Sequence, residues 1–189
     1  MERRGCGSDC VGDRGTLPSC NTGVTQEANA RSATGSPGQF REVGEGAGRG
    51  FTLNLPMPRG LGDADYSRAY REIVEPVGRA FDPQLVLVSA GFDAHEADPL
   101  GGMQVTDAGF AELMDVCVSI ASGSARGRVV AVLEGGYSLE GLAASTAASV
   151  GRLLDRPSPP LAPGVDSRTE GLLTAYRKAQ TPFWPVLEK

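Results

Sequence analysis

From about residue 50 onward, hydrophobic and polar residues recur along the chain with two different periodicities. Residues 51–55 alternate between apolar and polar, which predicts a short strand. Apolar residues then recur at spacings of three and four over 66–81, which predicts an amphipathic helix. Asp63 or Asp65 is expected to cap the start of this helix, and Pro76, which lies inside it, is expected to kink or shorten it.

A strand pattern followed by a helix pattern occurs twice more along the chain. Apolar runs at 85–89 and 129–133 predict two buried strands. A helical pattern follows each run, the first opened by Thr106 and the second capped by Ser138. Continuous apolar strands that alternate with helices predict an α/β fold, with a parallel sheet that carries helices on both faces.

Both ends of the chain differ in composition from this central region. Residues 1 to about 48 are rich in Gly, Ser, Thr, Asn and Arg and nearly lack Leu, Ile and Val, so we expect them to be disordered or poorly ordered. The stretch 155–165 is rich in proline and predicts a linker. A short helix is expected over 167–178, and Phe-Trp-Pro at 183–185 is expected to pack back as a C-terminal anchor.

Composition and charge narrow the classes of protein. The 189 residues, 40% of them apolar and 22% charged, suit one domain or most of one. A net charge of −5 argues against nucleic acid as a partner, because phosphate binding needs a basic surface. No stretch resembles a membrane span or a signal peptide, so we expect a cytoplasmic protein. The cysteines lack the spacing of a zinc finger and are expected to be free thiols: Cys6, Cys10, Cys20 and Cys117.

Residues with chemical potential follow the two apolar runs. Asp93 comes just after the first run, where a rigid and partly desolvated carboxylate suits a metal ligand or a general base, or simply caps the next turn. Tyr137 comes after the second run, behind Gly135 and Gly136. Its phenol could donate a hydrogen bond to a carbonyl oxygen that gains negative charge, or it could pack locally at a Gly-Gly turn.

Two other features of these loops favour less specific roles. His95 is the only histidine of the chain, so no pair of imidazoles and no Ser-His-Asp triad with a second histidine can form. It could be a ligand, an acid or base, or a residue with no chemical role, and the last is the most frequent. Asp98, which precedes Pro99, is expected to shape a turn. Glycines before a helix could bind phosphate, but neither G-x-G-x-x-G nor G-K-[ST] is present.

Three motifs stand in one order and spacing: F-T-L-N-L-P at 51–56, S-A-G-F-D-A-H-E-A-D-P-L-G-G at 89–102 and L-E-G-G-Y at 133–137. Together they resemble the histone deacetylase superfamily, which includes acetylpolyamine amidohydrolases and acetoin-utilisation proteins, and most of all its bacterial class II-like members. The resemblance implies part of an arginase/deacetylase α/β fold over 39–155, with a leader at 1–38 outside the family and a linker, helix and tail at 156–189.

The resemblance also implies a Zn²⁺ ion held by two Asp and one His, and hydrolysis of an acetylated protein lysine or an acetylated small amine. Asp93 matches the zinc-ligating aspartate that comes late in the family's chain. Tyr137 matches the tyrosine that stabilises the oxyanion, Gly135 and Gly136 match the wall of the acyl channel, and Leu100 matches a residue at its mouth. His95 falls within the motif but matches none of the family's ligands.

The family's paired histidines and its other zinc ligands have no counterpart in this sequence. We therefore expect the C-terminal half of a deacetylase domain, from a truncated reading frame or a split gene, and an isolated chain that is inactive or nearly so. The alternative is a non-catalytic half-domain that serves as a binding or assembly module. A sheet edge that lacks its neighbouring strands favours self-association or pairing with the missing N-terminal half.

Overall fold

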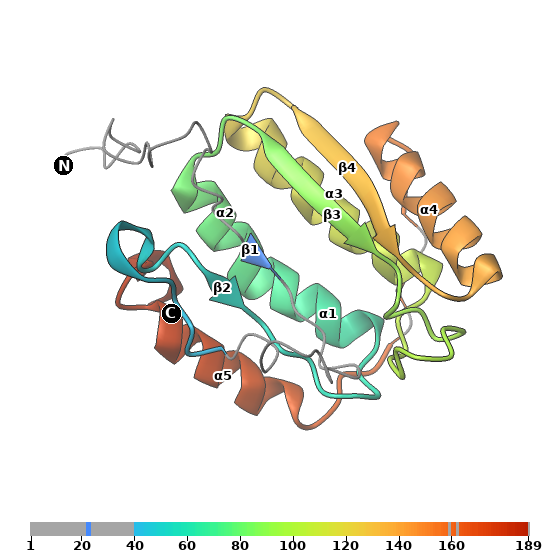
Figure 1. The fold of residues 1–189 in the computed structure, drawn as a ribbon, viewed down its shortest axis with the longest axis horizontal. Coiled ribbons are helices and arrows are strands. Elements are labelled where there is room, and N and C mark those ends of the chain that lie inside the picture. The colour runs from blue at the N-terminus through green and yellow to red at the C-terminus, as the bar shows by residue number, and fades with distance from the viewer. Residues whose placement is uncertain (1–21, 24–39, 159, 162, 189) are drawn as a thin grey trace.

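The computed structural model describes residues 22–23, 40–158, 160–161 and 163–188 (Figure 1). Helices and strands alternate over much of this region, and η2 and η4 are single 3-10 turns while η3 is a π-helical turn. In chain order the elements are β1 (Thr22–Gly23), η2 (Gly46–Gly48), β2 (Leu53–Asn54), α1 (Asp63–Ala69), η3 (Tyr70–Val74), α2 (Glu75–Phe81), β3 (Val86–Gly91), α3 (Asp107–Ser124), β4 (Val129–Gly135), α4 (Leu139–Leu153), α5 (Thr169–Gln180) and η4 (Pro185–Leu187).

The strands pair in parallel, in two separate pairs. β3 pairs with β4, and β1 pairs with β2. The register of the first pair runs from Val86 opposite Val129 to Ala90 opposite Leu133, and a bulge then leaves Glu134 without a partner residue. Parallel strands joined by a crossover helix confirm the α/β class that the alternating pattern predicts.

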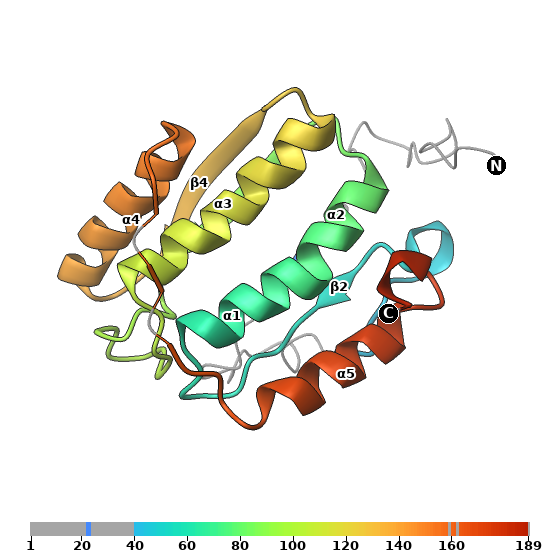
Figure 2. The same cartoon turned by 180° about the vertical axis from the view of Figure 1, so that it is seen from behind.

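The helices form a layer behind the strands. In Figure 1 β3 and β4 lie in front of α3, and Figure 2, which shows the molecule from behind, places α3 in front of them. In that rear view the continuous helix that contains α1 and α2 stands beside α3, and α3 stands beside α4. The core lies between this layer, the segment around β2 and α5, and its fully buried side chains include Leu55, Met57, Leu61, Ile73, Met103, Val105 and Leu173.

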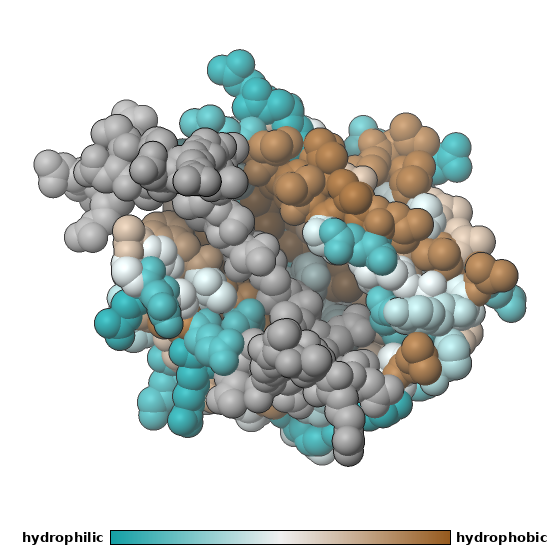
Figure 3. All heavy atoms as spheres, in the orientation of Figure 1, coloured by the Kyte–Doolittle hydropathy of each residue, from teal (hydrophilic) through white to brown (hydrophobic). Residues whose placement is uncertain are grey.

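The opposite face of β3 and β4 is open. Side chains alternate along a strand, and paired residues of parallel strands point to the same face, so Leu87, Val130 and Val132 share one face. They are 65%, 46% and 49% exposed, and Figure 3 shows hydrophobic side chains gathered over these strands. The sequence predicts helices on both faces, whereas no described helix packs here. The apolar run signals burial on both faces, but the described residues supply no helix for this face and leave Leu133 of β4 59% exposed on the other.

The helix predicted over 66–81 is continuous but irregular. It consists of α1, the π-helical turn η3 and α2, and Pro76 lies in the first turn of α2. Pro76 has no N–H to donate, and the wide turn directly before it absorbs this loss, so the helix continues to Phe81. The proline therefore changes the helix locally and does not end it.

The start of α1 is fixed by two buried aspartates. Gly62 is the N-cap residue, and its N–H donates to Oδ2 of Asp65 at 3.0 Å, so Asp65 caps the helix from inside its first turn. Oδ1 of Asp65 accepts hydrogen bonds from the hydroxyl of Thr169 at 2.6 Å and the N–H of Asp166 at 2.9 Å. Asp63 accepts the N–H of Thr106, the N-cap of α3, at 2.8 Å. This turn thereby joins the starts of α3 and α5.

The two ends of the described region pack onto each other. The indole N–H of Trp184 donates to the carbonyl of Gly50 at 2.8 Å, as the predicted C-terminal anchor requires. The ring of Phe40 lies 5.6 Å from that of Tyr176 on α5. Residues 40–48 belong to the segment that composition predicts as poorly ordered, yet they hold a turn at η2 and this ring contact, because α5 supplies an apolar surface for them. The rest of that segment lies outside the described residues, apart from β1.

Ion pairs hold α4 against its neighbours. Nε of Arg152 on α4 donates to Asp115 on α3 at 3.1 Å, and Arg71 on η3 reaches the other oxygen of Asp115 at 2.6 Å. Burial alone would raise the pKa of Asp115, but the two guanidinium groups outweigh it and hold the pKa below its usual value. The C-terminal end of α4 is thus tied to α3. No helix in the described part of the chain is long and apolar enough to cross a bilayer.

The thiol of Cys117 is expected to be unreactive in the folded chain. Burial on α3 raises its pKa to about 11, so almost no thiolate is present at pH 8. Alkylation by iodoacetamide should be about 100-fold slower in the native chain than in guanidinium chloride, because the thiolate is the nucleophile. Mass spectrometry of the peptide that contains Cys117 measures both rates, and equal rates would contradict the burial seen here. The other cysteines lie outside the described residues.

Candidate functional site

The carboxyl ends of β3 and β4 meet, as the ends of adjacent parallel strands must. The N–H of Phe92 donates to the carbonyl of Gly135 at 3.0 Å and joins the two strand ends. Asp93 follows directly and is half-buried. A Cβ atom on Gly135 would lie 2.8 Å from Oδ2 of Asp93, so the Asp93 carboxylate rests against the Gly135 backbone. The structure therefore brings together two of the residues that the sequence singles out.

Gly136 has a packing role as well. Its φ of 131° lies in the region that favours glycine, and a Cβ here would lie 3.2 Å from Cβ of Phe92 and 3.3 Å from Leu142 of α4. The Gly-Gly pair thus allows the loop after β4 to pass close to the Asp93 loop and then enter α4. Ser138 caps that helix as predicted, since its hydroxyl accepts the N–H of Gly141 at 3.2 Å.

Tyr137 and Leu100 lie at the surface of the two loops. The side chain of Tyr137 is 64% exposed and that of Leu100 is 47% exposed. Both backbones bind the same carboxylate: the N–H of Tyr137 donates to Oδ2 of Asp98 at 2.7 Å, and the N–H of Leu100 donates to Oδ1 at 2.8 Å. An exposed phenol on a backbone held in this way is free to meet a ligand.

The carboxylate of Asp98 joins the loop after β3 to the loop after β4. It is only 6% exposed, and the N–H of Gly101 also donates to its Oδ1, at 2.9 Å. Burial alone would raise the pKa of Asp98, but the backbone N–H groups of Tyr137, Leu100, Gly101 and Ser138 outweigh it and hold the pKa below its usual value. The side chain is therefore ionised at neutral pH.

The position of Asp98 shows which functional signal sequence reasoning missed. An Asp before a proline in a Gly-rich loop predicts a turn, and Oδ1 does bind the two amides of its own loop. The bond to Tyr137 spans 39 residues of sequence, and nothing in the local pattern indicates it. Only the pairing of β3 with β4 brings the two loops within reach.

His95 is a packed residue of the same loop. Its side chain is 7% exposed, and its Nδ1 accepts the N–H of Ala97 at 3.1 Å. The imidazole stacks on Phe110 of α3 with ring centroids 6.4 Å apart, and a Cβ on Gly141 would lie 2.5 Å from Nδ1. These contacts favour the interpretation of His95 as a structural residue between α3 and α4.

A complete metal site is not formed by the described residues. Among them, no group of three or more His, Cys, Asp or Glu side chains lies close enough to hold an ion. Protein zinc sites need three or four ligands, so Asp93 cannot hold zinc alone. The Zn²⁺ site that the resemblance implies does not fit this part of the chain by itself.

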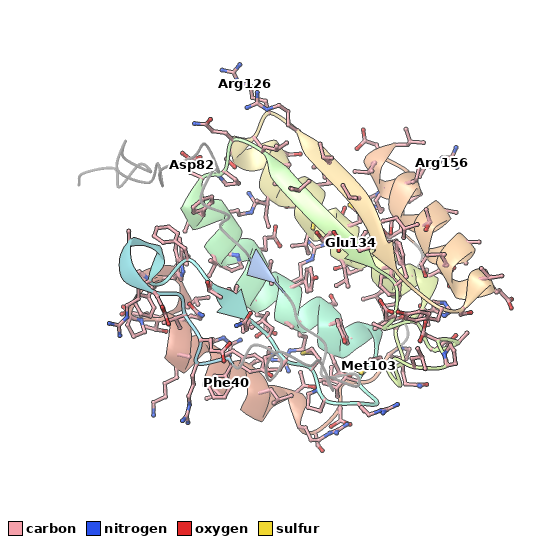
Figure 4. The ribbon with its side chains drawn as sticks, viewed as in Figure 1. Phe40, Asp82, Met103, Arg126, Glu134 and Arg156 are labelled. Atoms are coloured by element: carbon pink, nitrogen blue, oxygen red, sulfur yellow. The ribbon has the colours of Figure 1, made fainter. Side chains whose placement is uncertain are left out.

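Carboxylates also lie at the end of the open face of β3 and β4. Glu134, at the bulge of β4, lies over β3 and β4 in Figure 4. Its Oε1 accepts the hydroxyl of Ser89 at 3.0 Å, across the strand pair. The apolar face thus ends at Glu134 and Asp93, where the strands open into the loops that carry Tyr137 and Leu100.

Comparison with known proteins gives a consistent picture. The family model described as histone deacetylase domain matches residues 35–153. The polyamine deacetylase HDAC10 of Homo sapiens is 46% identical over 151 residues, which are 78% of this chain and 22% of that protein. A probable deacetylase of Archaeoglobus fulgidus is 47% identical over 108 residues, which are 57% of this chain and 29% of that protein.

Solved structures agree with these relatives. The HD domain of HDA15 superposes with a TM-score of 0.76 and 32% identity, over 87% of this chain and 45% of that one. The histone deacetylase Clr3 superposes with a TM-score of 0.73 and 35% identity, over 78% of this chain and 25% of that one. The chain therefore spans less than half the length of the solved relatives and about a quarter of the curated ones.

Proposed function

Because the chain belongs to the histone deacetylase family, we propose that it carries part of a deacetylase active site, the part that contains Asp93 and Tyr137. One observation carries this proposal. Asp93 and Tyr137 follow two adjacent parallel strands, and two contacts, Phe92 to Gly135 and Tyr137 to Asp98, join their loops. In open parallel sheets, ligands bind beyond the carboxyl ends of the strands.

The reaction we propose is hydrolysis of an N-acetyl amide to acetate and a free amine. The oxygen of water bonds to the acetyl carbon, the C–N bond breaks, and the amine nitrogen takes up a proton. The exposed phenol of Tyr137 would donate a hydrogen bond to the carbonyl oxygen as it gains negative charge. A donor fixed before the reaction needs no reorganisation, which is why a rigid backbone at Tyr137 matters.

We propose that Asp93 is one ligand of a Zn²⁺ site whose other ligands come from outside the described residues. In this family the ion would polarise the acetyl carbonyl. A general base must also come from elsewhere, because the only imidazole, that of His95, is buried between α3 and α4. The chain by itself is therefore expected to be inactive or nearly so.

The named relatives support a proposal for the substrate class. One is a polyamine deacetylase, and another, Clr3, is a histone deacetylase. We propose an acetylated protein lysine or an acetylated small amine for this chain. Leu100, half-exposed in the loop bound to that of Tyr137, would lie at the mouth of the acyl channel, and the backbone of Gly135 and Gly136 would form part of its wall.

The open apolar face favours a second candidate, a non-catalytic half-domain that binds another polypeptide. Leu87, Val130 and Val132 present a surface that a parallel sheet normally buries. Both candidates need something to cover this face. The first candidate predicts that the chain hydrolyses an acetylated substrate once this face is covered, and the second predicts that it does not.

Activity and zinc content separate the two candidates. The purified 189-residue chain should contain no stoichiometric zinc and release no acetate from acetyl-lysine peptide or N-acetylputrescine. In a chimera, residues 35–153 of this chain replace the matching segment of human polyamine deacetylase HDAC10, whose remaining residues supply the rest of the domain. We expect zinc and turnover in the chimera. Tyr137→Phe should lower kcat about 100-fold with zinc retained, whereas Asp93→Asn should lose zinc.

Glu96→Gln is the matched control, since Glu96 is an exposed carboxylate of the same loop. A folded, zinc-loaded chimera without turnover would support the non-catalytic candidate. Unchanged kcat in Tyr137→Phe would remove Tyr137 from the proposed site. Zinc and turnover in the unmodified chain would show that residues outside the described ones complete the site.

A further inference from the structure

The carboxylate of Asp98 divides its two oxygens between two loops. Oδ1 accepts the N–H groups of Leu100 and Gly101, which lie in its own loop after β3. Oδ2 accepts the N–H of Tyr137, which lies in the loop after β4, at 2.7 Å, and the N–H of the next residue, Ser138, also stabilises this carboxylate. Because the side chain is 6% exposed, water competes little for either oxygen.

Tyr137 is held through its backbone and not through its side chain. Its side chain is exposed, so packing does not fix the residue. Before it, Gly135 and Gly136 pack closely on Asp93 and Phe92, and after it Ser138 caps α4. Between these fixed neighbours, the N–H of Tyr137 itself donates to Asp98, and a hydrogen bond to a charged acceptor is about twice as strong as a neutral one.

The other end of the same clamp fixes the Asp93 loop. Gly101, whose N–H Asp98 binds, packs directly on the carbonyl of Asp93, where even a methyl group would overlap. One buried carboxylate, bonded to backbone N–H groups of both loops, therefore helps to set the position of Asp93 relative to Tyr137. A misplacement of about 1 Å in such a pair can cost about 100-fold in rate.

We propose that Asp98 is a positioning residue that holds the backbone of Tyr137 against the Asp93 loop. The catalytic consequence rests on the proposed deacetylase function, whereas the clamp itself does not. The competing interpretation is that Asp98 shapes only its own turn. The two interpretations differ in the role of Oδ2. A residue that shapes only its own turn needs Oδ1 alone, whereas the clamp also needs the bond from Tyr137 to Oδ2.

Asp98→Asn separates the two interpretations. Asparagine keeps the shape and one acceptor oxygen, but its NH₂ group cannot accept a hydrogen bond. We expect the oxygen to keep the two amides of Leu100 and Gly101, and the amide of Tyr137 to lose its partner. Hydrogen exchange of single amides in the 189-residue chain, followed by NMR, reads all three without substrate or metal.

The expected result is that the Tyr137 amide is protected in the wild-type chain and exchanges at least about tenfold faster in Asp98→Asn, while Leu100 and Gly101 stay protected. Glu96→Gln, the exposed control, should change none of them. Unprotected exchange at Tyr137 in the wild-type chain would overturn the clamp, whatever the fold of the variant. Equal protection of Tyr137 in both chains would overturn it too.

The catalytic consequence has its own readout. In the chimera with human polyamine deacetylase HDAC10, Asp98→Asn should lower kcat about 10- to 100-fold while KM and zinc content stay unchanged, because only the oxyanion donor moves. A rise in KM with kcat unchanged would contradict a positioning role. If exchange at Tyr137 responds but the chimera never turns over, the clamp stands and the proposed deacetylation fails.

Discussion

Replacing Gly101 by alanine is expected to destabilise the chain by about 3 kcal/mol and to displace the Asp93 loop. The Cβ of alanine would overlap the backbone carbonyl of Asp93, so relief requires the movement of one chain segment past another. No rotamer change can relieve a clash with backbone. Gly101 is also one of the amides that Asp98 binds, so the displacement should extend to that contact.

Urea unfolding followed by circular dichroism measures the change in free energy. Gly171→Ala is a matched control, since Gly171 lies exposed on α5 with no atom within 4 Å of an added Cβ. Alanine there should stabilise the helix by about 1 kcal/mol, because it loses less backbone entropy than glycine. A Gly101→Ala chain as stable as wild type would show that the loop after β3 lies differently from the arrangement described.

Asp65→Ala is the second substitution with a large expected effect, about 3 kcal/mol of lost stability. The carboxylate accepts three hydrogen bonds, from Gly62, Asp166 and Thr169, and Thr169 is fully buried. Alanine leaves the buried hydroxyl of Thr169 without an acceptor where water does not reach, and removes the acceptor of the two backbone N–H groups. We expect the start of α5 to detach from α1, so amides of α5 should exchange faster than those of α3.

Asp107→Ala supplies the comparison for this loss. Asp107 is also an aspartate in the first turn of a helix, but it is exposed, so only its interaction with the helix dipole is removed, worth about 0.5 kcal/mol. Thermal unfolding of both variants, with exchange of α5 amides as the local probe, tests the assignment. Equal losses in the two variants would mean that the helix terminus, and not the buried contacts, determines the effect.

The sequence predicts the elements of this fold better than their contacts. Thr106 and Ser138 cap α3 and α4 as expected, because a cap is a local pattern of side chain and backbone. The two central strands each extend two residues beyond their predicted ends, into Ala90–Gly91 and Glu134–Gly135. Hydrophobicity marks the buried part of a strand, whereas the ladder of hydrogen bonds continues past it.

The candidate site is predicted in its residues but not in its geometry. Asp93 and Tyr137 are conspicuous because they follow apolar runs, and the parallel pairing of β3 and β4 brings their loops together. The link through Asp98 depends on that pairing and has no local signature. The same holds for Asp65, whose sequence signal is a helix cap and whose contacts reach residues about a hundred positions away.

Because the face of β3 and β4 is open, the stability of the chain depends on the concentration of whatever binds there. Anything that binds Leu87, Val130 and Val132 in the folded state but not in the unfolded one adds its binding free energy to that of folding, about 2.7 kcal/mol at a hundred times its dissociation constant. The melting temperature is then a function of the concentration of whatever covers the strands. In a cell, the abundance of this chain would follow the supply of that cover, since the uncovered fraction is what chaperones and proteases meet.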